Sequence, residues 1–189
     1  MRKVILFNLT TLDGFFADAK GAIDWHIVDE EFRAFAIQQL DSVDTILFGR
    51  RTYQLMVSYW PTEAAIKRDP AIAGKMNQTA KIVFSRTLEK AEWTNLRLVK
   101  EKAAEEVAKL KQQPGKDVII FGSGNLAATL TQNCLIDEYR MMVNPIVLGS
   151  GHPFFQGVED RLPMKLIDSR VFGSGSVLLS YRPNKERSH

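Results

Sequence analysis

The feature that most constrains this chain is an alternation of short apolar runs, rich in Val, Ile and Phe, with segments whose apolar residues recur at helical spacing. Four such runs lie at 3–9, 45–49, 81–85 and 118–122. Helical patterns lie at 29–40, 51–60, 103–111 and 125–132. This alternation is typical of βαβ units, which build parallel sheets covered by helices. The sequence therefore predicts an α/β fold.

The C-terminal third of the chain has a different pattern. Three longer runs rich in strand-forming residues lie at 138–149, 164–172 and 176–182, and a Gly-Ser-Gly turn separates the last two. Such a short turn indicates an antiparallel hairpin. We therefore predict a mostly parallel central sheet with an antiparallel C-terminal edge and helices on both faces. We expect residues 1–183 to form a single domain and residues 184–189 to form a polar tail.

Composition excludes several classes of function. The chain has 189 residues, 45% of them hydrophobic and 25% charged, and it lacks the roughly 18 consecutive apolar residues of a membrane helix. The net charge of +3 is spread among acids, so no nucleic-acid partner is expected. The single cysteine, Cys134, favours a cytoplasmic location, and we expect it to be a buried structural thiol. The histidines His26, His152 and His189 are too widely spaced to predict a metal site.

Three predicted strands end in similar sequences, namely LFGRRT at 47–52, VFSRT at 83–87 and IFGSGNL at 120–126. Glycine permits close backbone approach, a helix start offers free N–H groups, and arginine grips phosphate with a planar fork. Each sequence alone also fits a tight turn or a surface arginine. Because ligands of parallel sheets bind at the carboxyl ends of the strands, the three together predict a phosphate-rich cofactor there.

The same residues carry a family resemblance that covers nearly the whole chain. Its elements are TLDG at 11–14, Trp25, GRRT at 49–52, IVFSR at 82–86, GSG at 122–124 and IDEYRMMVNPIVLGSGHPFF at 136–155. The chain resembles the dihydrofolate reductase superfamily. It is most similar to the branch that contains the reductase domain of the riboflavin-biosynthesis deaminase/reductase and its stand-alone bacterial relatives. The resemblance implies a dihydrofolate-reductase-like three-layer fold, NADPH as cofactor and a homodimer.

The resemblance also implies a set of cofactor-binding residues. Arg50 and Arg86 are expected at the adenosine 2′-phosphate, a group that accounts for two guanidiniums where NAD enzymes usually place an acid. The residues expected around the pyrophosphate are Gly49, Arg51, Thr52, Ser85, Gly122, Ser123, Gly124, Asn125 and Leu126. Those expected to close over the nicotinamide are Leu12, Phe16, Ala17 and Trp25.

The sequence says less about the residues that bind the substrate than about those that bind the cofactor. Dihydrofolate reductases hold the pterin with a carboxylate on the first helix, and Asp29, Glu30 and Glu31 lie there. We favour Glu31 as the catalytic carboxylate because it lies one turn before Phe35. All three acids also fit the roles of N-cap and first-turn acids that complement the helix dipole.

Further residues bear on the choice of substrate. Arg33 matches a basic residue near the ribose phosphate in riboflavin-pathway reductases, and with Asp29 and Glu30 it is a substrate-binding candidate. Phe121 stands where those reductases usually carry an acid. Gly149, Ser150 and Gly151 either line the substrate pocket or form a turn.

The resulting hypothesis is an NADPH-dependent reductase that transfers hydride to a C=N or C=O bond of a small heterocyclic or ribosyl-aminopyrimidine substrate. The alternatives are a pterin reductase of the dihydrofolate reductase type and a nucleotide-binding module of the same fold without turnover.

Overall fold

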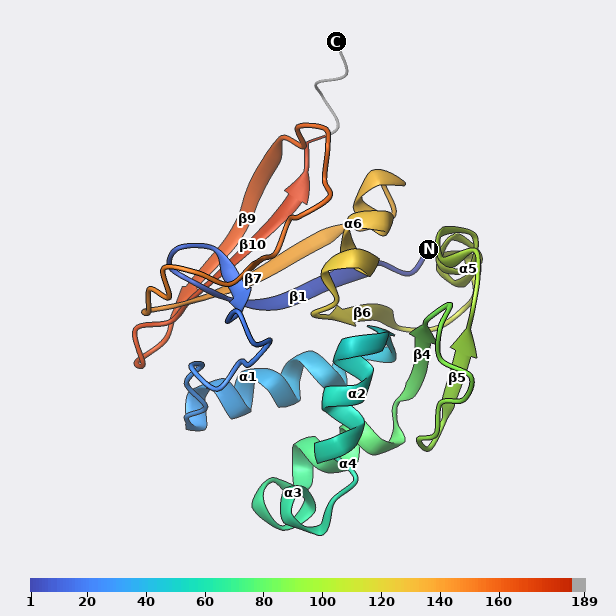
Figure 1. The fold of residues 1–189 in the computed structure, drawn as a ribbon, viewed down its shortest axis with the longest axis horizontal. Helices are drawn as coiled ribbons and strands as arrows, with labels where there is room; N and C mark the ends of the chain where they lie inside the picture. Colours follow the sequence, from blue (N-terminus) through green and yellow to red (C-terminus); the bar gives the residue numbers. More distant parts are fainter. Residues whose placement is uncertain (185–189) are drawn as a thin grey trace.

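The computed structural model describes residues 1–184 and contains an eight-stranded sheet with helices on both faces (Figure 1). The strand order is β5-β4-β3-β6-β1-β7-β10-β9. The first six strands in this order are parallel to one another. Strand β10 runs antiparallel to β7, and β9 runs antiparallel to β10. The predicted fold class, including the antiparallel C-terminal edge, is confirmed. Of the expected tail, residues 185–189 lie outside the described part of the chain.

The bounds of the elements follow the sequence pattern closely. The sheet strands are β1 Val4–Thr11, β3 Val43–Gly49, β4 Ala80–Phe84, β5 Leu96–Val99, β6 Asp117–Phe121, β7 Glu138–Asn144, β9 Met164–Val171 and β10 Val177–Pro183. The helices are α1 Glu30–Asp41, α2 Arg50–Tyr59, α3 Glu63–Arg68, α4 Pro70–Gln78, α5 Ala103–Gln112 and α6 Gly124–Gln132. Strands β2 Phe15–Ala17 and β8 His152–Pro153 form a separate two-stranded sheet.

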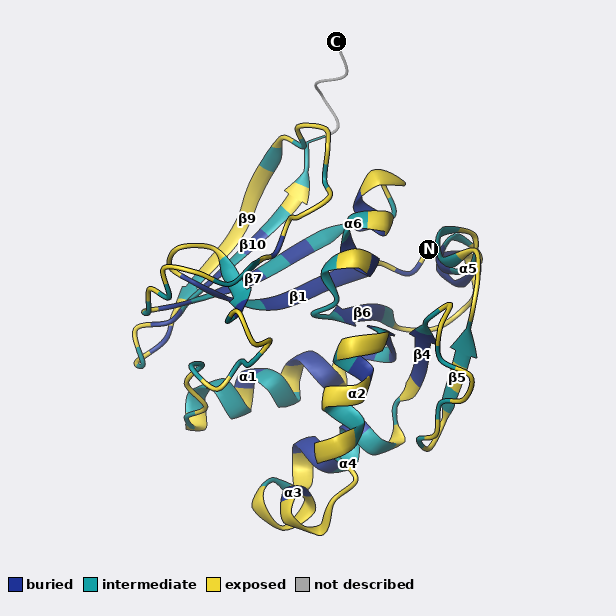
Figure 2. Ribbon diagram, in the orientation of Figure 1, coloured by how far each residue is buried: buried dark blue, intermediate teal, exposed yellow. Residues whose placement is uncertain are grey.

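Hydrophobic cores cover both faces of the sheet (Figure 2). On one face α5 and α6 pack against alternate residues of β1, β3 and β6, among them Leu6 and Ile120. On the other face α1, α2 and α4 pack against the intervening residues, including Ile5 and Phe48. This alternation is the period of a strand that is buried on both sides.

Two local expectations are corrected by the structure. The run 138–149 ends as a strand at Asn144, because Pro145 follows and cannot donate a ladder hydrogen bond. Cys134 is exposed rather than buried, and it follows α6 with a positive φ of 54°. The expectation of a buried structural thiol was therefore wrong.

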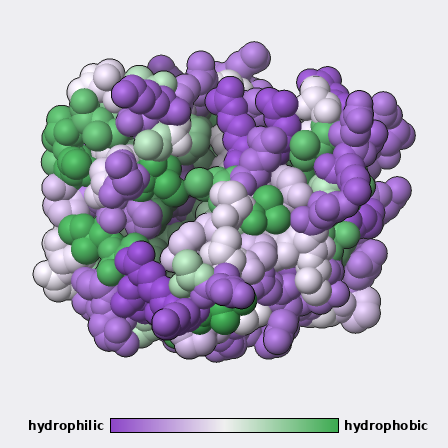
Figure 3. Space-filling model, turned by 60° about the horizontal axis from the view of Figure 1, so that its bottom comes forward, coloured by the Kyte–Doolittle hydropathy of each residue, from purple (hydrophilic) through white to green (hydrophobic). Residues whose placement is uncertain are grey.

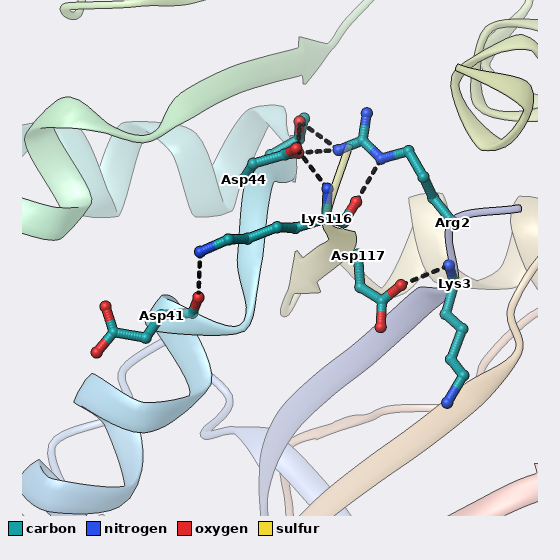
Figure 4. Close-up of polar contacts among 7 residues, drawn as sticks. Arg2, Lys3, Asp41, Asp44, Lys116 and Asp117 are labelled. Carbon is teal, nitrogen blue, oxygen red and sulfur yellow. Dashed lines mark hydrogen bonds and ion pairs between the residues drawn. The ribbon is translucent and has the colours of Figure 1, made fainter. Parts of the chain in front are cut away.

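A charged network joins chain segments at the amino ends of the parallel strands (Figure 4). The buried Arg2 pairs with Asp44, and its Nε donates to the carbonyl of Lys116. The Asp44 carboxylate also accepts from the Lys116 amide at 2.8 Å, and Asp117 accepts from the Lys3 amide at 2.8 Å. At this amino edge of the sheet the charged side chains are paired with one another and with backbone groups, whereas the carboxyl edge is open.

Within residues 1–184, no helix combines the length and the apolar character that crossing a membrane requires. The same described part of the chain holds no group of three or more His, Cys, Asp or Glu side chains in a position to bind a metal.

Candidate cofactor and substrate cleft

Two hydrogen bonds through side-chain hydroxyls link the end of β3 and the start of α2 to the turn that follows β6. These strands are parallel neighbours, and the turn after β6 lies beside the start of α2. Ser123 Oγ accepts from the Gly49 amide at 2.7 Å and donates to Thr52 Oγ1 at 2.8 Å. Gly122 has a φ of 57°, and a Cβ there would lie 3.1 Å from Thr52 Oγ1, so this position requires glycine. These two hydrogen bonds fix the start of α2 relative to the start of α6.

The N-termini of α2 and α6 open into one cavity of about 280 Å³. Neither N-cap, Gly49 or Ser123, has a side chain that caps the first turn, and neither first turn contains an acid. The free N–H groups and the helix dipoles therefore favour an anion here. The lining consists of Phe16, Gly49, Arg50, Arg51, Thr52, Ser123, Gly124, Asn125, Leu126, His152, Pro153, Phe154 and Gln156.

Three arginines lie at this edge without a carboxylate partner in the described residues 1–184: Arg50, Arg51 and Arg86. Arg50 donates to Thr87 Oγ1 at 3.2 Å, which links the start of α2 to the loop after β4. Arg51 lines the cavity, whereas Ser85 and Arg86 lie outside its lining. The Ser85 hydroxyl accepts from the amides of Thr87 and Leu88 and so shapes that loop.

The small sheet of β2 and β8 covers the cleft. Phe16 and His152, one from each strand, both line the anion cavity. A Cβ at Gly151 would collide with the carbonyl of Ala17, so this glycine allows the two strands to pair. Of the three residues 149–151 none lines the cavities described here, which argues for a turn rather than a substrate-binding role.

The aspartate of the TLDG motif anchors this cover. The Asp13 carboxylate accepts from the Thr11 hydroxyl at 2.6 Å and from the Gly149 amide at 2.8 Å. The hydrogen bond from Thr11, together with those from the Gly149 and Leu148 amides, lowers the pKa of the Asp13 carboxyl. Leu12 is 68% exposed and lines none of the cavities described here, so its role at the nicotinamide stays a prediction.

The anion cavity continues into two further cavities. A cavity of about 210 Å³ shares Phe16, Arg51, Thr52 and His152 with it. That cavity shares Phe7, Leu9, Ile23, Leu55, Met56 and Phe121 with a third one of about 490 Å³ beside α1. We call the second the junction cavity and the third the α1 cavity. In the space-filling view one face of the molecule is hollowed, and hydrophobic side chains gather around the hollow (Figure 3).

The face of α1 that lines the α1 cavity carries no carboxylate. It contributes Phe32, Arg33, Ala36, Gln39 and Leu40. Asp29 caps the helix by accepting from the Phe32 amide at 2.8 Å, and Glu30 is exposed.

Glu31 points to the C-terminal hairpin instead. Its carboxylate accepts from the Gly173 amide at 2.8 Å and from Arg170 Nη2 at 2.9 Å. The bond from Gly173 and then that from Arg170 lower the pKa of the Glu31 carboxyl. The structure therefore argues against the catalytic role expected for Glu31, because both carboxylate oxygens bind the hairpin and neither faces the cavity.

The α1 cavity is lined largely by aromatic and aliphatic side chains, with a paired charge at its wall. Arg33 Nε donates to Asp69 Oδ2 at 2.9 Å, and the two side chains are 27% and 14% exposed. His26 lines the same cavity, and its Nδ1 contacts the carbonyl of Ile23. Of the expected substrate-binding residues, only Arg33 reaches this cavity.

Several cleft residues were missed or undervalued by sequence reasoning. Asn8 and His152 line the junction cavity, and Asp24 and Asp69 line the α1 cavity. His152 lies in the quoted motif GSGHPFF, which could have pointed to it, whereas nothing local marks Asn8 or Asp69. Trp25, expected over the nicotinamide, lies outside the lining of all three cavities, and its indole nitrogen is buried without a hydrogen-bond partner.

Comparisons with known proteins give the family and the fold of the chain. The chain is 35% identical to the uncharacterized protein YyaP of Bacillus subtilis (strain 168), over 97% of this chain and 96% of YyaP. A putative riboflavin biosynthesis protein from Shewanella sp. PV-4 superposes with a TM-score of 0.74 at 26% identity, covering 97% and 99% of the two chains. Dihydrofolate reductase from Enterococcus faecalis, complexed with NADP(H), has the same fold, with a TM-score of 0.65 at 14% identity over 97% of each chain.

The model of the RibD C-terminal domain matches residues 2–178, which include every strand that lines the cleft. That span confirms the branch of the dihydrofolate reductase superfamily inferred from the sequence. The chain belongs to the RibD C-terminal domain family.

Proposed function

We propose that this protein is an NADPH-dependent reductase that transfers hydride to a C=N or C=O bond of a small heterocyclic substrate. One observation carries the proposal: two uncapped helix N-termini and unpaired arginines meet in a cleft that continues into a large apolar cavity. Such a cleft suits a ligand that is anionic at one end and a planar ring at the other.

The residues at the carboxyl edge fit NADPH. In this proposal the first-turn amides of α2 and α6 bind the pyrophosphate, and Arg51 and Thr52 lie beside it. Arg50 and Arg86 bind the 2′-phosphate, since they come from the ends of adjacent strands whose last residues, Gly49 and Phe84, are paired. The nicotinamide occupies the junction cavity beneath Phe16 and His152.

The cofactor supplies the chemistry, because NADPH delivers two electrons and a proton as hydride to the electrophilic carbon, while the nitrogen or oxygen of that bond takes up a proton. The protein residues bind, orient and exclude water. The cover formed by β2 and β8 contributes Phe16, Ala17 and His152 to the wall of the junction cavity. His26 lines the α1 cavity, is partly buried and makes no ion pair within residues 1–184, and we propose it as the proton donor; Asp24 lines the same cavity but is exposed.

The α1 cavity supports a small heterocycle better than a phosphoribosyl-aminopyrimidine. A phosphate group needs unpaired cations, but Arg33 is neutralised by Asp69 at 2.9 Å. Arg68 also lines the cavity and has no carboxylate partner within residues 1–184, but it is exposed, and solvent screening weakens its attraction for a phosphate. The remaining wall is largely apolar, which suits a planar ring that carries no charge.

Titration with NADPH and NADH tests the proposal. The protein contains three tryptophans, so quenching of their fluorescence reports binding, and loss of NADPH absorbance reports turnover. We expect tighter binding of NADPH than of NADH, and oxidation of NADPH in the presence of 7,8-dihydropterin. Absence of NADPH binding, or equal affinity for the two cofactors, would refute the proposal. Binding without oxidation across pterins and aminopyrimidines would favour the nucleotide-binding module, which the lack of a carboxylate on the cavity face of α1 makes the second candidate.

A homodimer and a cytoplasmic location complete the proposal; the homodimer rests on the family, and the location rests on the single cysteine. Exposed apolar side chains on the edge strand β9, Leu166, Ile167 and Val171, support the dimer.

A further inference from the structure

Asn8 is a buried amide without a partner at the centre of the cleft. It lies in β1, is 7% exposed and lines the junction cavity. Among the buried side-chain nitrogen and oxygen atoms of residues 1–184, only Asn8 Nδ2 and the indole nitrogen of Trp25 lack a hydrogen bond. Buried amides in folded proteins are almost always paired, so this one requires an explanation.

The register of the sheet sets Asn8 at the point where the cavities meet. Phe7 pairs with Phe121 at the end of β6, so Asn8 lies level with the Gly122 turn. A Cβ on Gly122 would lie 3.8 Å from Asn8 Oδ1. The flanking residues Phe7 and Leu9 line both the junction cavity and the α1 cavity. Asn8 itself lines the junction cavity, which shares lining residues with both the anion cavity and the α1 cavity.

A second buried asparagine shows what this sheet does with an amide that has only a structural role. Asn144, at the end of the adjacent strand β7, is 2% exposed. Its Nδ2 donates to the carbonyls of Thr10 at 3.2 Å and Met142 at 3.1 Å, and its Oδ1 accepts from Ser176 at 3.3 Å. Asn144 is satisfied by the protein itself, whereas Asn8 is not.

We propose that Asn8 is a specificity-determining residue of the cleft, whose amide hydrogen-bonds a carbonyl or carboxamide group on a planar ring bound in the junction cavity. A half-turn about the bond to the amide exchanges its nitrogen and oxygen, so the side chain can offer a donor or an acceptor to the ring. Such a group can come from the nicotinamide or from a lactam ring of the substrate. The inference rests on the proposed function, since it concerns the same cleft.

The stability of matched variants gives the first test. Asn8→Leu removes an unpaired polar group and keeps a similar volume, so we expect the melting temperature of the ligand-free protein to rise by about 2–4 °C. Asn144→Leu breaks three hydrogen bonds, so we expect its melting temperature to fall. A purely structural role for Asn8 predicts that both variants lose stability.

Ligand binding gives the second test. We expect Asn8→Leu to bind NADPH or 7,8-dihydropterin about tenfold more weakly than the wild type does, a loss of about 1.4 kcal/mol. The fragment 2′,5′-ADP lacks the nicotinamide and should bind equally to both proteins. If only the affinity for NADPH falls, the carbonyl that binds Asn8 belongs to the cofactor. If only the affinity for the pterin falls, it belongs to the substrate. If Asn8→Leu does not fold, Asn8→Ala serves in the binding assay.

The outcomes separate this inference from the proposed function. A wild-type protein that does not bind NADPH refutes the proposed function. A wild-type protein that binds NADPH and dihydropterin with affinities unchanged in Asn8→Leu refutes the role of Asn8 alone. A fall in melting temperature as large as that of Asn144→Leu refutes it as well, because the amide would then have a partner within the protein.

Discussion

The arginines after β3 and β4 should decide the choice between NADPH and NADH. Gly49 and Phe84 are paired at the ends of these parallel strands, so Arg50 and Arg86 both follow the carboxyl ends of neighbouring strands. Both are exposed, and neither has a carboxylate partner within residues 1–184. Arg50 makes one hydrogen bond, to Thr87 at 3.2 Å. Their charge is therefore available to the 2′-phosphate, the group that distinguishes the two cofactors.

The expected effect follows from the exposure of the two side chains. A hydrogen bond between charged groups contributes about 1.5–3 kcal/mol, and solvent screening favours the lower value here. Arg50→Ala and Arg86→Ala should each weaken NADPH binding about tenfold, and the double variant about a hundredfold. The affinity for NADH should change less than threefold. The loss of NADPH affinity in the variants should become smaller as salt is added, because the Debye length falls from about 10 Å at 0.1 M to about 3 Å at 1 M.

Tryptophan fluorescence titrations of the wild type, both single variants and the double variant measure these ratios. Arg97→Ala is a matched control, because it removes the same charge from the edge strand β5, where Arg97 pairs with Glu106 at 3.0 Å. Its preference for NADPH over NADH should equal that of the wild type. Equal losses of NADPH and NADH affinity in the double variant would refute the reasoning, since the arginines would then not recognise the 2′-phosphate.

Two further predictions concern side chains outside the cofactor site. Glu31→Gln should change kcat/KM less than twofold in the NADPH oxidation assay, because the Glu31 carboxylate accepts from the Gly173 amide and does not face the α1 cavity. A loss of kcat/KM above a hundredfold would show that Glu31 is a catalytic residue. Lys81 is 1% exposed, and burial lowers its pKa to about 8, below the value of about 10.4 in an unfolded chain. Between these values the unfolded state binds more protons, so the stability of the wild type relative to Lys81→Met should rise by about 1 to 3 kcal/mol from pH 8 to pH 10. Urea unfolding at several pH values measures this difference, and a constant or falling difference contradicts it.

The half of the cleft that we propose binds the cofactor could be located from the sequence because its elements are local. The glycine, the arginines and the threonine of GRRT follow one another, and the turn Gly122–Gly124 opens its own helix. Strand periodicity and the parallel arrangement then bring these short segments to one edge of the sheet, with no need to know any long-range contact.

The substrate half depended on contacts far apart in the sequence. Glu31 meets Arg170 and Gly173 across 139 and 142 residues, and Arg33 meets Asp69 across 36. Adjacent acids at a helix start look alike in the sequence, and only the packing of α1 decides which way each one points.

The sequence by itself determined the α/β fold, the family and the segments that face the proposed cofactor, because short-range periodicity and turn chemistry encode them. The tertiary structure alone decided that the α1 cavity lacks a carboxylate from its own helix and that Asn8 has no partner. Whether a buried polar group is satisfied depends on atoms contributed by distant strands, and no local pattern in the sequence records it.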